Sequence, residues 1–337
     1  NLIKRAVVGT VFRKRQFVFF KQKRFIAACL NPGRIFAGTH GTGTARIENE
    51  RVAWTRPAGD GHDAYTWSAL HDRQGRLWTG TFNSGLFLEE DGVQKPFRIP
   101  KQLGPSVGAL LEDSKGRIWV GASSGLGVIE NQVARVWPGS DAFTKVNVRS
   151  ILEDPREEML WVGTFGHGLW QVDLKNPGKE THIEGLPRKR ITSLAIDNDG
   201  CTWAGVFGEG LFCIRDGRPV VQVGRRQGLP ASTIGSFLED GRGCCWLGSD
   251  QGILRVSSAS LHRVVKGRAP EARFYVFDCA DGMDIQECSE GLQPSAIRDS
   301  MGRLWFATLR GAVRLDPTRV RLNKRPPPVV IERFNFR

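Results

Sequence analysis

Short apolar segments alternate with polar, glycine-rich turns along most of this 337-residue chain. Between residues 150 and 183, apolar segments at 150–153, 160–164, 169–172 and 182–183 are separated by turn residues that include Asp154 and Gly166. Segments of about four to six residues, with a turn every ~8–12 residues, are typical of short β-strands and leave no room for long helices. The pattern predicts an all-β chain whose strands come in groups of four.

The group of four strands recurs along the sequence. Each copy contains an aromatic residue that is followed two residues later by glycine or, in the last copy, by alanine. These aromatic residues are Phe36, Trp78, Trp119, Trp161, Trp203, Trp246 and Trp305. They are spaced 41 to 43 residues apart, except for a final spacing of 59. Four strands in ~42 residues is the period of a β-propeller blade. We therefore predict an all-β fold, a seven-bladed β-propeller of four-stranded blades, over residues 26–323.

An aspartate precedes most of these tryptophans at a fixed distance. It lies six residues before the tryptophan at Asp72, Asp113, Asp197, Asp240 and Asp299, and seven residues before it at Asp154. In the turn D-x-x-G, the aspartate accepts a backbone hydrogen bond and the glycine adopts a positive φ. We interpret the aspartates and the tryptophans as structural, with the tryptophans packed between neighbouring blades.

The net charge of +13 is confined to the two ends of the chain. Residues 1–24 carry +8 and residues 319–337 carry +5, so the segment between them is neutral. A nucleic-acid-binding protein usually has a basic face on its folded body, with aromatic residues interleaved for base stacking. The neutral centre argues against a nucleic-acid partner.

No motif in the sequence supports catalysis, a metal or a cofactor. The six histidines are scattered, and the glycine-rich segment 38–44 lacks the lysine and the helix of a phosphate-binding loop. The seven cysteines form no C-x-x-C pair, and we interpret them as small buried apolar residues. A disulfide between Cys279 and Cys288 is an alternative in an oxidising compartment.

The repeat, S-x-L-x-D-x-x-G-x-[LI]-W-x-G-T-x-x-G-L, closely resembles the two-component regulator propeller repeat of bacterial extracytoplasmic sensors. The resemblance covers about residues 26–318. Its last unit runs from Phe277 through Gly302-Arg303-Leu304-Trp305 to Asp316-Pro317 and resembles the closing blade that precedes a small immunoglobulin-like module in this family. The resemblance implies the periplasmic part of an inner-membrane protein that dimerises and carries a cytoplasmic histidine kinase or diguanylate cyclase. Some relatives are implicated in sensing polysaccharide fragments.

The two ends depart from the repeat. Residues 1–25 are basic and aromatic, and they are interpreted either as a strand that closes the ring or as a stretch of a longer chain. Residues 324–337 contain three consecutive prolines, Pro326 to Pro328. This segment resembles the linker and the first strand of the immunoglobulin-like module, cut off after Arg337. We therefore expect a fragment of a longer protein, and the sequence leaves open whether further blades precede it.

Candidate ligand contacts lie on two sets of loops. In a propeller, the loops between the second and third strands of each blade and the loops that join successive blades open on the same face. Residues that vary between copies at these positions are not required by the scaffold. They are Tyr65, Trp67, Phe82, Asn83, Asn147, Arg149, Phe165, His167, Arg188, Arg190, Phe207, Glu209, Asp250, Gln293 and Arg310. Aromatic rings can stack on sugars while arginine and amide groups bind hydroxyls or carboxylates, so these residues predict a site for an oligosaccharide or a small anionic metabolite.

The sequence therefore favours the extracytoplasmic ligand-sensing domain of a bacterial membrane-bound signal-transduction protein, without enzymatic activity. Two alternatives remain. A propeller lyase or glycosidase acting on glycans would need clustered carboxylates, or a histidine and a tyrosine, at the channel mouth. A protein-interaction scaffold would present a contiguous apolar patch larger than a monomer normally exposes.

Overall fold

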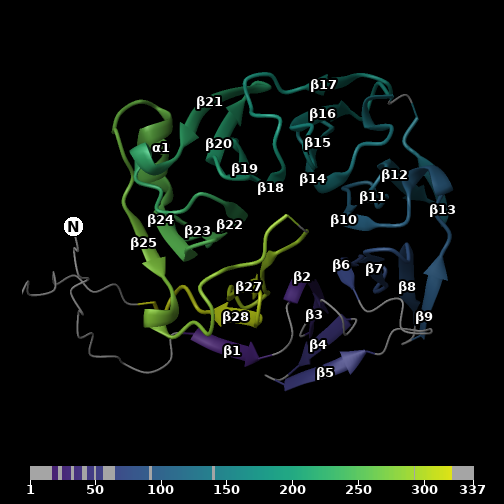
Figure 1. Cartoon of the computed structure of the whole chain (residues 1–337), viewed down its shortest axis with the longest axis horizontal. Coiled ribbons are helices and arrows are strands. Elements are labelled where there is room, and N and C mark those ends of the chain that lie inside the picture. The colour runs from purple at the N-terminus through teal and green to yellow at the C-terminus, as the bar shows by residue number, and fades with distance from the viewer. Residues whose placement is uncertain are drawn as a thin grey trace, which may run out of the picture.

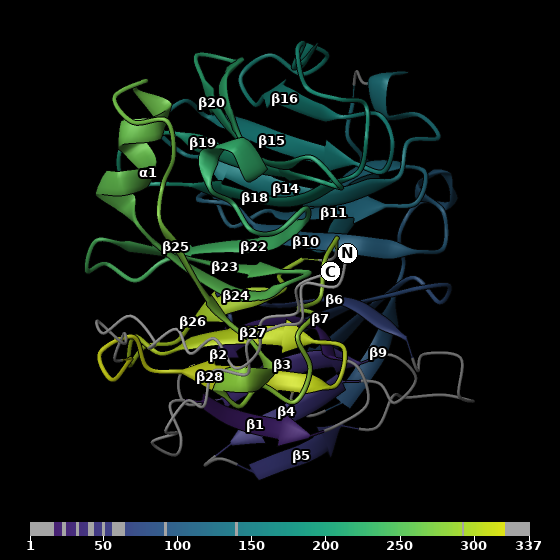
Figure 2. The same cartoon turned by 60° about the vertical axis from the view of Figure 1, so that its left-hand side comes forward.

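The computed structural model describes residues 17–21, 25–31, 34–39, 44–48, 51–55, 65–90, 93–138, 141–291 and 293–320. Its strands form four-stranded antiparallel sheets arranged around a central axis, like the blades of a propeller (Figure 1). A 60° turn shows neighbouring sheets stacked side by side (Figure 2). The prediction of an all-β propeller with four-stranded blades is confirmed.

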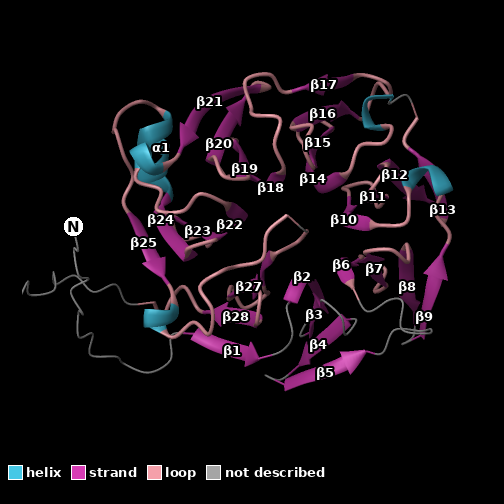
Figure 3. Ribbon diagram, viewed as in Figure 1, coloured by secondary structure: helices cyan, strands magenta, loops and turns pink. Residues whose placement is uncertain are grey.

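Six of the seven sheets consist of four consecutive strands, the first nearest the axis and the fourth outermost (Figure 3). The first two sheets contain β2 (Phe25–Asn31), β3 (Arg34–Thr39), β4 (Thr44–Glu48) and β5 (Arg51–Thr55), then β6 (Thr66–His71), β7 (Leu77–Thr81), β8 (Leu86–Glu90) and β9 (Val93–Phe97). The next two contain β10 (Val107–Glu112), β11 (Ile118–Ala122), β12 (Gly125–Glu130) and β13 (Val133–Val136), then β14 (Val148–Asp154), β15 (Met159–Thr164), β16 (Leu169–Asp173) and β17 (Glu180–His182). The last two contain β18 (Ile191–Ile196), β19 (Thr202–Val206), β20 (Gly210–Arg215) and β21 (Arg218–Val223), then β22 (Ile234–Glu239), β23 (Cys244–Ser249), β24 (Gly252–Ser257) and β25 (Phe274–Phe277).

The remaining sheet combines strands from distant parts of the sequence. It contains β26 (Ala296–Arg298), β27 (Leu304–Thr308), β28 (Gly311–Leu315) and β1 (Phe17–Lys21). β1 pairs antiparallel with β28, from Phe17 opposite Leu315 to Lys21 opposite Gly311. The outer strand of this sheet thus comes from the basic N-terminal segment. Residues 1–16 and the predicted start of the immunoglobulin-like module lie outside the described residues.

Among the described residues, helical structure is confined to short segments between strands. The connection between β24 and β25 contains α1 (Ser258–Val265), on the outside of the ring (Figure 3). Its residues Leu261 and Val264 join the buried cluster that contains Trp203. The 3-10 helices are η1 (Lys101–Leu103), η2 (Asp141–Phe143), η3 (Arg225–Gln227) and η4 (Cys279–Asp281).

The repeated aspartates fix the tryptophans of their own sheets. The Trp Nε1 donates to an aspartate Oδ2 at 2.7 Å (Trp78–Asp72), 2.8 Å (Trp119–Asp113), 2.6 Å (Trp203–Asp197), 3.0 Å (Trp246–Asp240) and 2.9 Å (Trp305–Asp299). Trp161 is the exception, because the turn after Asp154 has one more residue and the Trp161 Nε1 is buried without an acceptor. The structural interpretation of these aspartates is confirmed.

The tryptophans also pack against neighbouring sheets, as predicted. Trp78, Trp119, Trp203 and Trp246 are fully buried. The ring of Trp203 stacks on Phe237 of the following sheet, with centroids 5.6 Å apart. These rings account for the regular spacing of the aromatic residues in the sequence.

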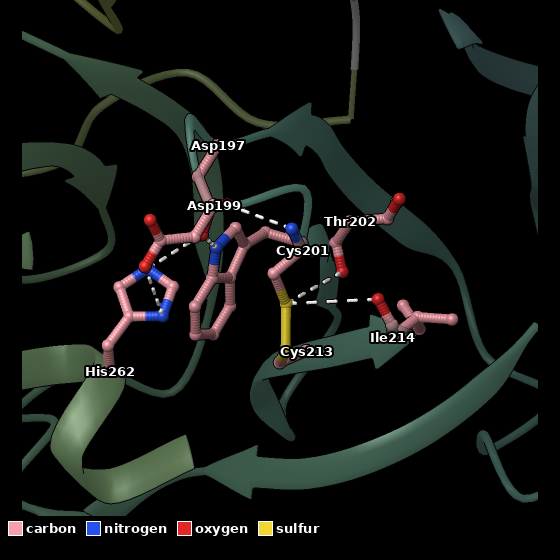
Figure 4. The surroundings of a disulfide bond; sticks show 8 residues. Asp197, Asp199, Cys201, Thr202, Cys213, Ile214 and His262 are labelled. Carbon is pink, nitrogen blue, oxygen red and sulfur yellow. Dashed lines mark hydrogen bonds and ion pairs between the residues drawn. A yellow bond between two sulfur atoms is a disulfide. The ribbon is translucent and has the colours of Figure 1, made fainter. Parts of the chain in front are cut away.

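One sheet has a histidine beside its aspartate. In three other sheets an arginine four residues after the aspartate donates its Nε at 2.7 Å (Arg76, Arg117 and Arg303). Cys201 occupies this position after Asp197, and His262 of α1 lies beside the carboxylate instead (Figure 4). The Nε2 of His262 is 3.0 Å from Asp197 Oδ2, and its Nδ1 is 3.3 Å from Asp199 Oδ2.

The alternative of a Cys279–Cys288 disulfide is wrong. Both cysteines are free, and the disulfide instead joins Cys201 to Cys213, with Cα atoms 6.0 Å apart (Figure 4). The two bonded cysteines lie on or beside the paired strands β19 and β20, a separation that suits a disulfide. Cys279 lies in the exposed η4, whereas Cys288 is buried in a β-bridge with Thr308.

Among the free cysteines that the structure describes, Cys279 is the exposed one and is expected to react readily. Burial raises the pKa of Cys245 and of Cys288 to about 12, so almost none of either thiol is thiolate near neutral pH. Iodoacetamide applied to the native protein should therefore label Cys279 before these two, as peptide mass spectrometry would show. Faster labelling of Cys288, or labelling of Cys201 without a reductant, would contradict this arrangement.

Candidate functional site

A β-bulge recurs near the start of the innermost strand in six sheets. The backbone register shifts between Phe25 and Ala27, Thr66 and Ser68, Val107 and Ala109, Val148 and Ser150, Ile191 and Ser193, and Ile234 and Ser236. Bulges change the direction of a side chain and often occur next to functional sites. Two of the bulged positions hold the candidate residues Trp67 and Arg149.

Backbone hydrogen bonds join the two sets of loops. The amide after the second strand donates to the carbonyl before the first strand at 3.0 Å (Phe82 to Tyr65), 2.8 Å (Ser123 to Ser106), 2.8 Å (Phe165 to Asn147), 3.0 Å (Phe207 to Arg190) and 3.3 Å (Asp250 to Thr233). The two sets of loops therefore lie side by side at the same end of these sheets.

Five of the candidate residues form a ladder in which aromatic rings alternate with guanidinium groups. The Cζ of Arg149 is 4.2 Å from the ring centroid of Trp67 and 5.6 Å from that of Phe165. The Cζ of Arg190 is 5.8 Å from the centroid of Phe165 and 4.4 Å from that of Phe207. We call Trp67, Arg149, Phe165, Arg190 and Phe207 the cation–π ladder.

The ladder combines exposed rings with partly buried cations. Phe165 is 50% exposed and Phe207 is 46% exposed. Phe82, 43% exposed, extends the ladder because its ring lies 4.5 Å from that of Trp67. Burial, together with the charge of Arg190, lowers the pKa of Arg149 to about 10, which leaves the group protonated at neutral pH.

A segment before β26 reaches into the centre of the ring (Figure 1). Glu290 of this segment forms an ion pair with Arg190. Gln293 accepts a hydrogen bond from the backbone amide of Ile151 at 2.6 Å and donates one to its carbonyl at 2.5 Å. Gln293 is therefore occupied in joining the segment to β14.

The remaining candidates lie outside the ladder. Asn83 accepts a 3.5 Å hydrogen bond from Ser106, and Asp250 accepts hydrogen bonds from Ser232 at 3.2 Å and 2.6 Å. Glu209 pairs with Lys189 at 2.6 Å. The others are Tyr65 and Asn147, at the loop ends that the backbone bonds join, and the exposed His167, Arg188 and Arg310. Arg188 takes part in none of the contacts that define the ladder.

Two residues that contact the ladder arginines, Glu290 and Gly108, were not predicted from the sequence. Glu290 is 100 residues from Arg190 in the sequence, so no local pattern relates them. Gly108 leaves room for Arg149, since a Cβ there would lie 3.3 Å from the Arg149 Cδ. Gly108 occupies the bulged position in its own sheet, and comparing the copies at that position could have identified it.

Several cavities are lined by residues outside the cation–π ladder. One, of about 140 Å³, lies between the innermost strands and the central segment and is lined by Ser150, Thr192 and Pro294 among others. Another, of about 520 Å³, lies under α1 and is lined by Asp199, Glu239 and His262 among others. Within the described ranges no group of three His, Cys, Asp or Glu residues is placed to hold a metal ion. None of the helices described there has the length and apolar character needed to cross a membrane.

Part of the chain matches a known repeat family. Residues 102–124 match the family described as "Two component regulator propeller". No curated protein sequence gives a significant match.

Several solved structures share the fold. The extracellular domain of the hybrid two-component system BT3049 from B. thetaiotaomicron is 18% identical, with a TM-score of 0.55 over 87% of this chain and 51% of that one. The corresponding domain of BT4673 from the same organism is 17% identical, with a TM-score of 0.54 over 88% of this chain and 46% of that one. Virginiamycin B lyase from Staphylococcus aureus, solved with quinupristin, is 12% identical, with a TM-score of 0.68 over 89% of this chain and 98% of that one.

At these identities the similarity concerns the fold. The chain spans about half the length of the two extracellular domains, at 51% and 46%. Residues 102–124 are a two-component regulator propeller repeat, in a chain whose fold is shared with extracellular domains of two-component systems.

Proposed function

We propose that this chain is the ligand-sensing, periplasmic segment of a bacterial membrane-bound signalling protein of the two-component type. Its ligand is a small molecule, an oligosaccharide or an anionic metabolite, that binds at the cation–π ladder. The segment forms a seven-bladed ring closed by β1, continues into an immunoglobulin-like module, and acts in a homodimer whose output is a kinase or a cyclase. The segment itself is not an enzyme.

The cation–π ladder is the observation that supports this proposal. Ligand sites typically combine apolar ring surfaces with a few well-placed polar groups. The ladder has three aromatic side chains and two guanidiniums within one set of stacked contacts. Exposed phenylalanines are unfavourable in water, and their recurrence at one end of the propeller suits a surface that a ligand covers.

Signalling from this site requires differential binding. A ligand shifts an equilibrium only by the difference in its affinity for the two states. A change from 1:99 to 99:1 requires a difference of about 5.5 kcal/mol. Because Glu290 and Gln293 connect the ladder region to the segment before β26, a ligand there can favour one arrangement of the last sheet over another.

A thermal-shift screen against oligosaccharides, uronic acids and small anionic metabolites tests the proposal. A ligand present at 100 times its Kd should add about 2.7 kcal/mol to the free energy of unfolding. The shift should disappear in Arg149→Ala and Arg190→Ala and persist in Arg135→Ala, which changes an exposed residue of β13. A shift that survives both ladder variants would place the ligand elsewhere. Absence of any shift would favour a propeller that acts through protein contacts.

A lyase is the second candidate function. The similarity to virginiamycin B lyase covers nearly all of that enzyme, which was solved as a catalytically inactive variant in which a histidine is replaced by alanine. In this chain the exposed His167 lies two residues from Phe165 of the ladder. Turnover of a glycan panel or of quinupristin that is lost in His167→Ala would establish the lyase and overturn the sensor proposal.

A further inference from the structure

The guanidinium of Arg149 lies beside two aromatic rings, and its Nε has no hydrogen-bond acceptor among the described residues. Trp67 and Phe165 both lie within 5.6 Å of its Cζ. The N–H groups of a guanidinium are strong hydrogen-bond donors, and contact with an aromatic ring gives them no oxygen acceptor. The Arg149 Nε is buried without an acceptor, and no carboxylate among the described residues pairs with this side chain.

The unpaired charge of Arg149 is unfavourable in the free protein. Burial and the charge of Arg190 both lower its pKa. The charge of Arg190 acts in the same direction as burial, and no ion pair between Arg149 and a carboxylate is present among the described residues. A partly buried cation without a counter-ion loses hydration that nothing replaces. An anion bound at the edge of Arg149 would restore both the hydrogen bonds and the charge balance.

Arg190 differs because the protein supplies its counter-ion. Glu290 pairs with Arg190, although burial raises the pKa of that carboxyl. The two arginines and Glu290 together carry one net positive charge. This charge suits one carboxylate better than a doubly charged phosphate.

The rings beside the arginines add an apolar requirement. Phe82, Phe165 and Phe207 are each 43–50% exposed, so about half of each ring is available to a ligand. A ligand that reaches Arg149 would lie against Phe165, which contacts both arginines. The site therefore suits a carboxylate that is attached to a ring with an apolar face.

We propose that the cation–π ladder binds a singly charged carboxylate carried on a ring, with Arg149 as its main anion-binding residue. Glu290 limits the site to one negative charge by occupying Arg190. This inference rests on the proposed function, because it names the ligand class of the same site. Sugar acids and aromatic acids share this chemistry.

Calorimetric titration with five probes separates these sources. The probes are D-galacturonate, benzoate, their neutral counterparts D-galactose and benzyl alcohol, and inorganic phosphate. At least one carboxylate should bind about tenfold more tightly than its neutral counterpart and than phosphate, as expected for a charge-assisted, bidentate contact. Arg149→Gln should weaken that binding about tenfold or more, and Arg149→Lys, which keeps the charge but not the planar fork, should weaken it less. Arg135→Gln should leave it unchanged.

Glu290→Gln tests the limit on charge. This variant frees Arg190 and raises the net charge of the three groups to two. The affinity for phosphate should therefore increase about fivefold or more, and the ratio of carboxylate affinity to phosphate affinity should fall. Thermal melting of each variant checks that it is folded. If Glu290→Gln is unstable, the loss of carboxylate binding in Arg149→Gln still tests the inference.

Four results would overturn the inference. Equal binding of a carboxylate and its neutral counterpart would show that charge is not recognised. Full carboxylate affinity in Arg149→Gln would exclude that residue as the anion-binding group. A third result is binding of a neutral sugar alone that is lost in Phe165→Ala and kept in Arg149→Gln. It would overturn the claim that the ligand is a carboxylate but leave the proposed function intact. No binding of any probe or screened compound would overturn both.

Discussion

Replacement of Asp113 by alanine is expected to lower the free energy of unfolding by about 3–5 kcal/mol, as when one partner of a buried ion pair is removed. The Asp113 carboxylate is fully buried and accepts four hydrogen bonds. Two come from the backbone amides of Lys115 and Arg117, one from Arg117 Nε at 2.7 Å and one from Trp119 Nε1 at 2.8 Å. Without the carboxylate, the buried Trp119 loses its acceptor and Arg117 loses its counter-ion.

Asp154→Ala is the matched control. Its carboxylate bonds to Arg156, which is 56% exposed, and the Trp161 Nε1 already lacks a partner. Asp154→Ala should therefore lower the free energy of unfolding by less, about 1–2 kcal/mol. Urea unfolding of the two variants and the parent measures both changes. Equal losses would contradict the view that the bond from aspartate to tryptophan stabilises each sheet.

Deletion of residues 1–22 is expected to lower the free energy of unfolding by about 3–5 kcal/mol, at ~1 kcal/mol for each backbone hydrogen bond lost. The deletion removes β1 and leaves β28 as an unpaired edge. Unpaired edges also promote association between sheets, so the shortened protein should tend to aggregate.

The control for this prediction is deletion of residues 1–16, which leaves all five paired residues of β1 in place. In thermal melting, the chain without residues 1–22 should unfold at a lower temperature than the chain without residues 1–16. In size-exclusion chromatography, it should also show more aggregate. If both melt like the full chain, pairing between β1 and β28 contributes little and the last sheet is stable with three strands.

The repeat made the scaffold predictable from the sequence. The tryptophan spacing, the aspartate turns and the structural role of both follow from local patterns, because each four-stranded sheet is encoded within one repeat. Alignment of the repeat copies also identified Arg149, Phe165, Arg190 and Phe207 as residues on neighbouring loops that vary between copies. Propeller geometry then brings them together.

The errors and omissions all depend on contacts that the repeat does not encode. Glu290 and Gln293 reach Arg190 and Ile151 only because a segment late in the sequence enters the ring. Cys201 bonds to Cys213 because this copy of the repeat has cysteines at two positions that lie on or beside neighbouring strands. His262 reaches Asp197 from α1, an insertion without an equivalent among the other described sheets. Such contacts are specific to one copy and have no signal in the common pattern.

A structure of the protein bound to the strongest compound from the thermal-shift screen would test the central claim most directly. The account predicts that the compound lies at the channel mouth, against Phe165, with an acceptor atom within hydrogen-bond distance of the Arg149 guanidinium. A compound seated instead in the cavity under α1, beside Glu239 and His262, would contradict the assignment of the ladder as the ligand site.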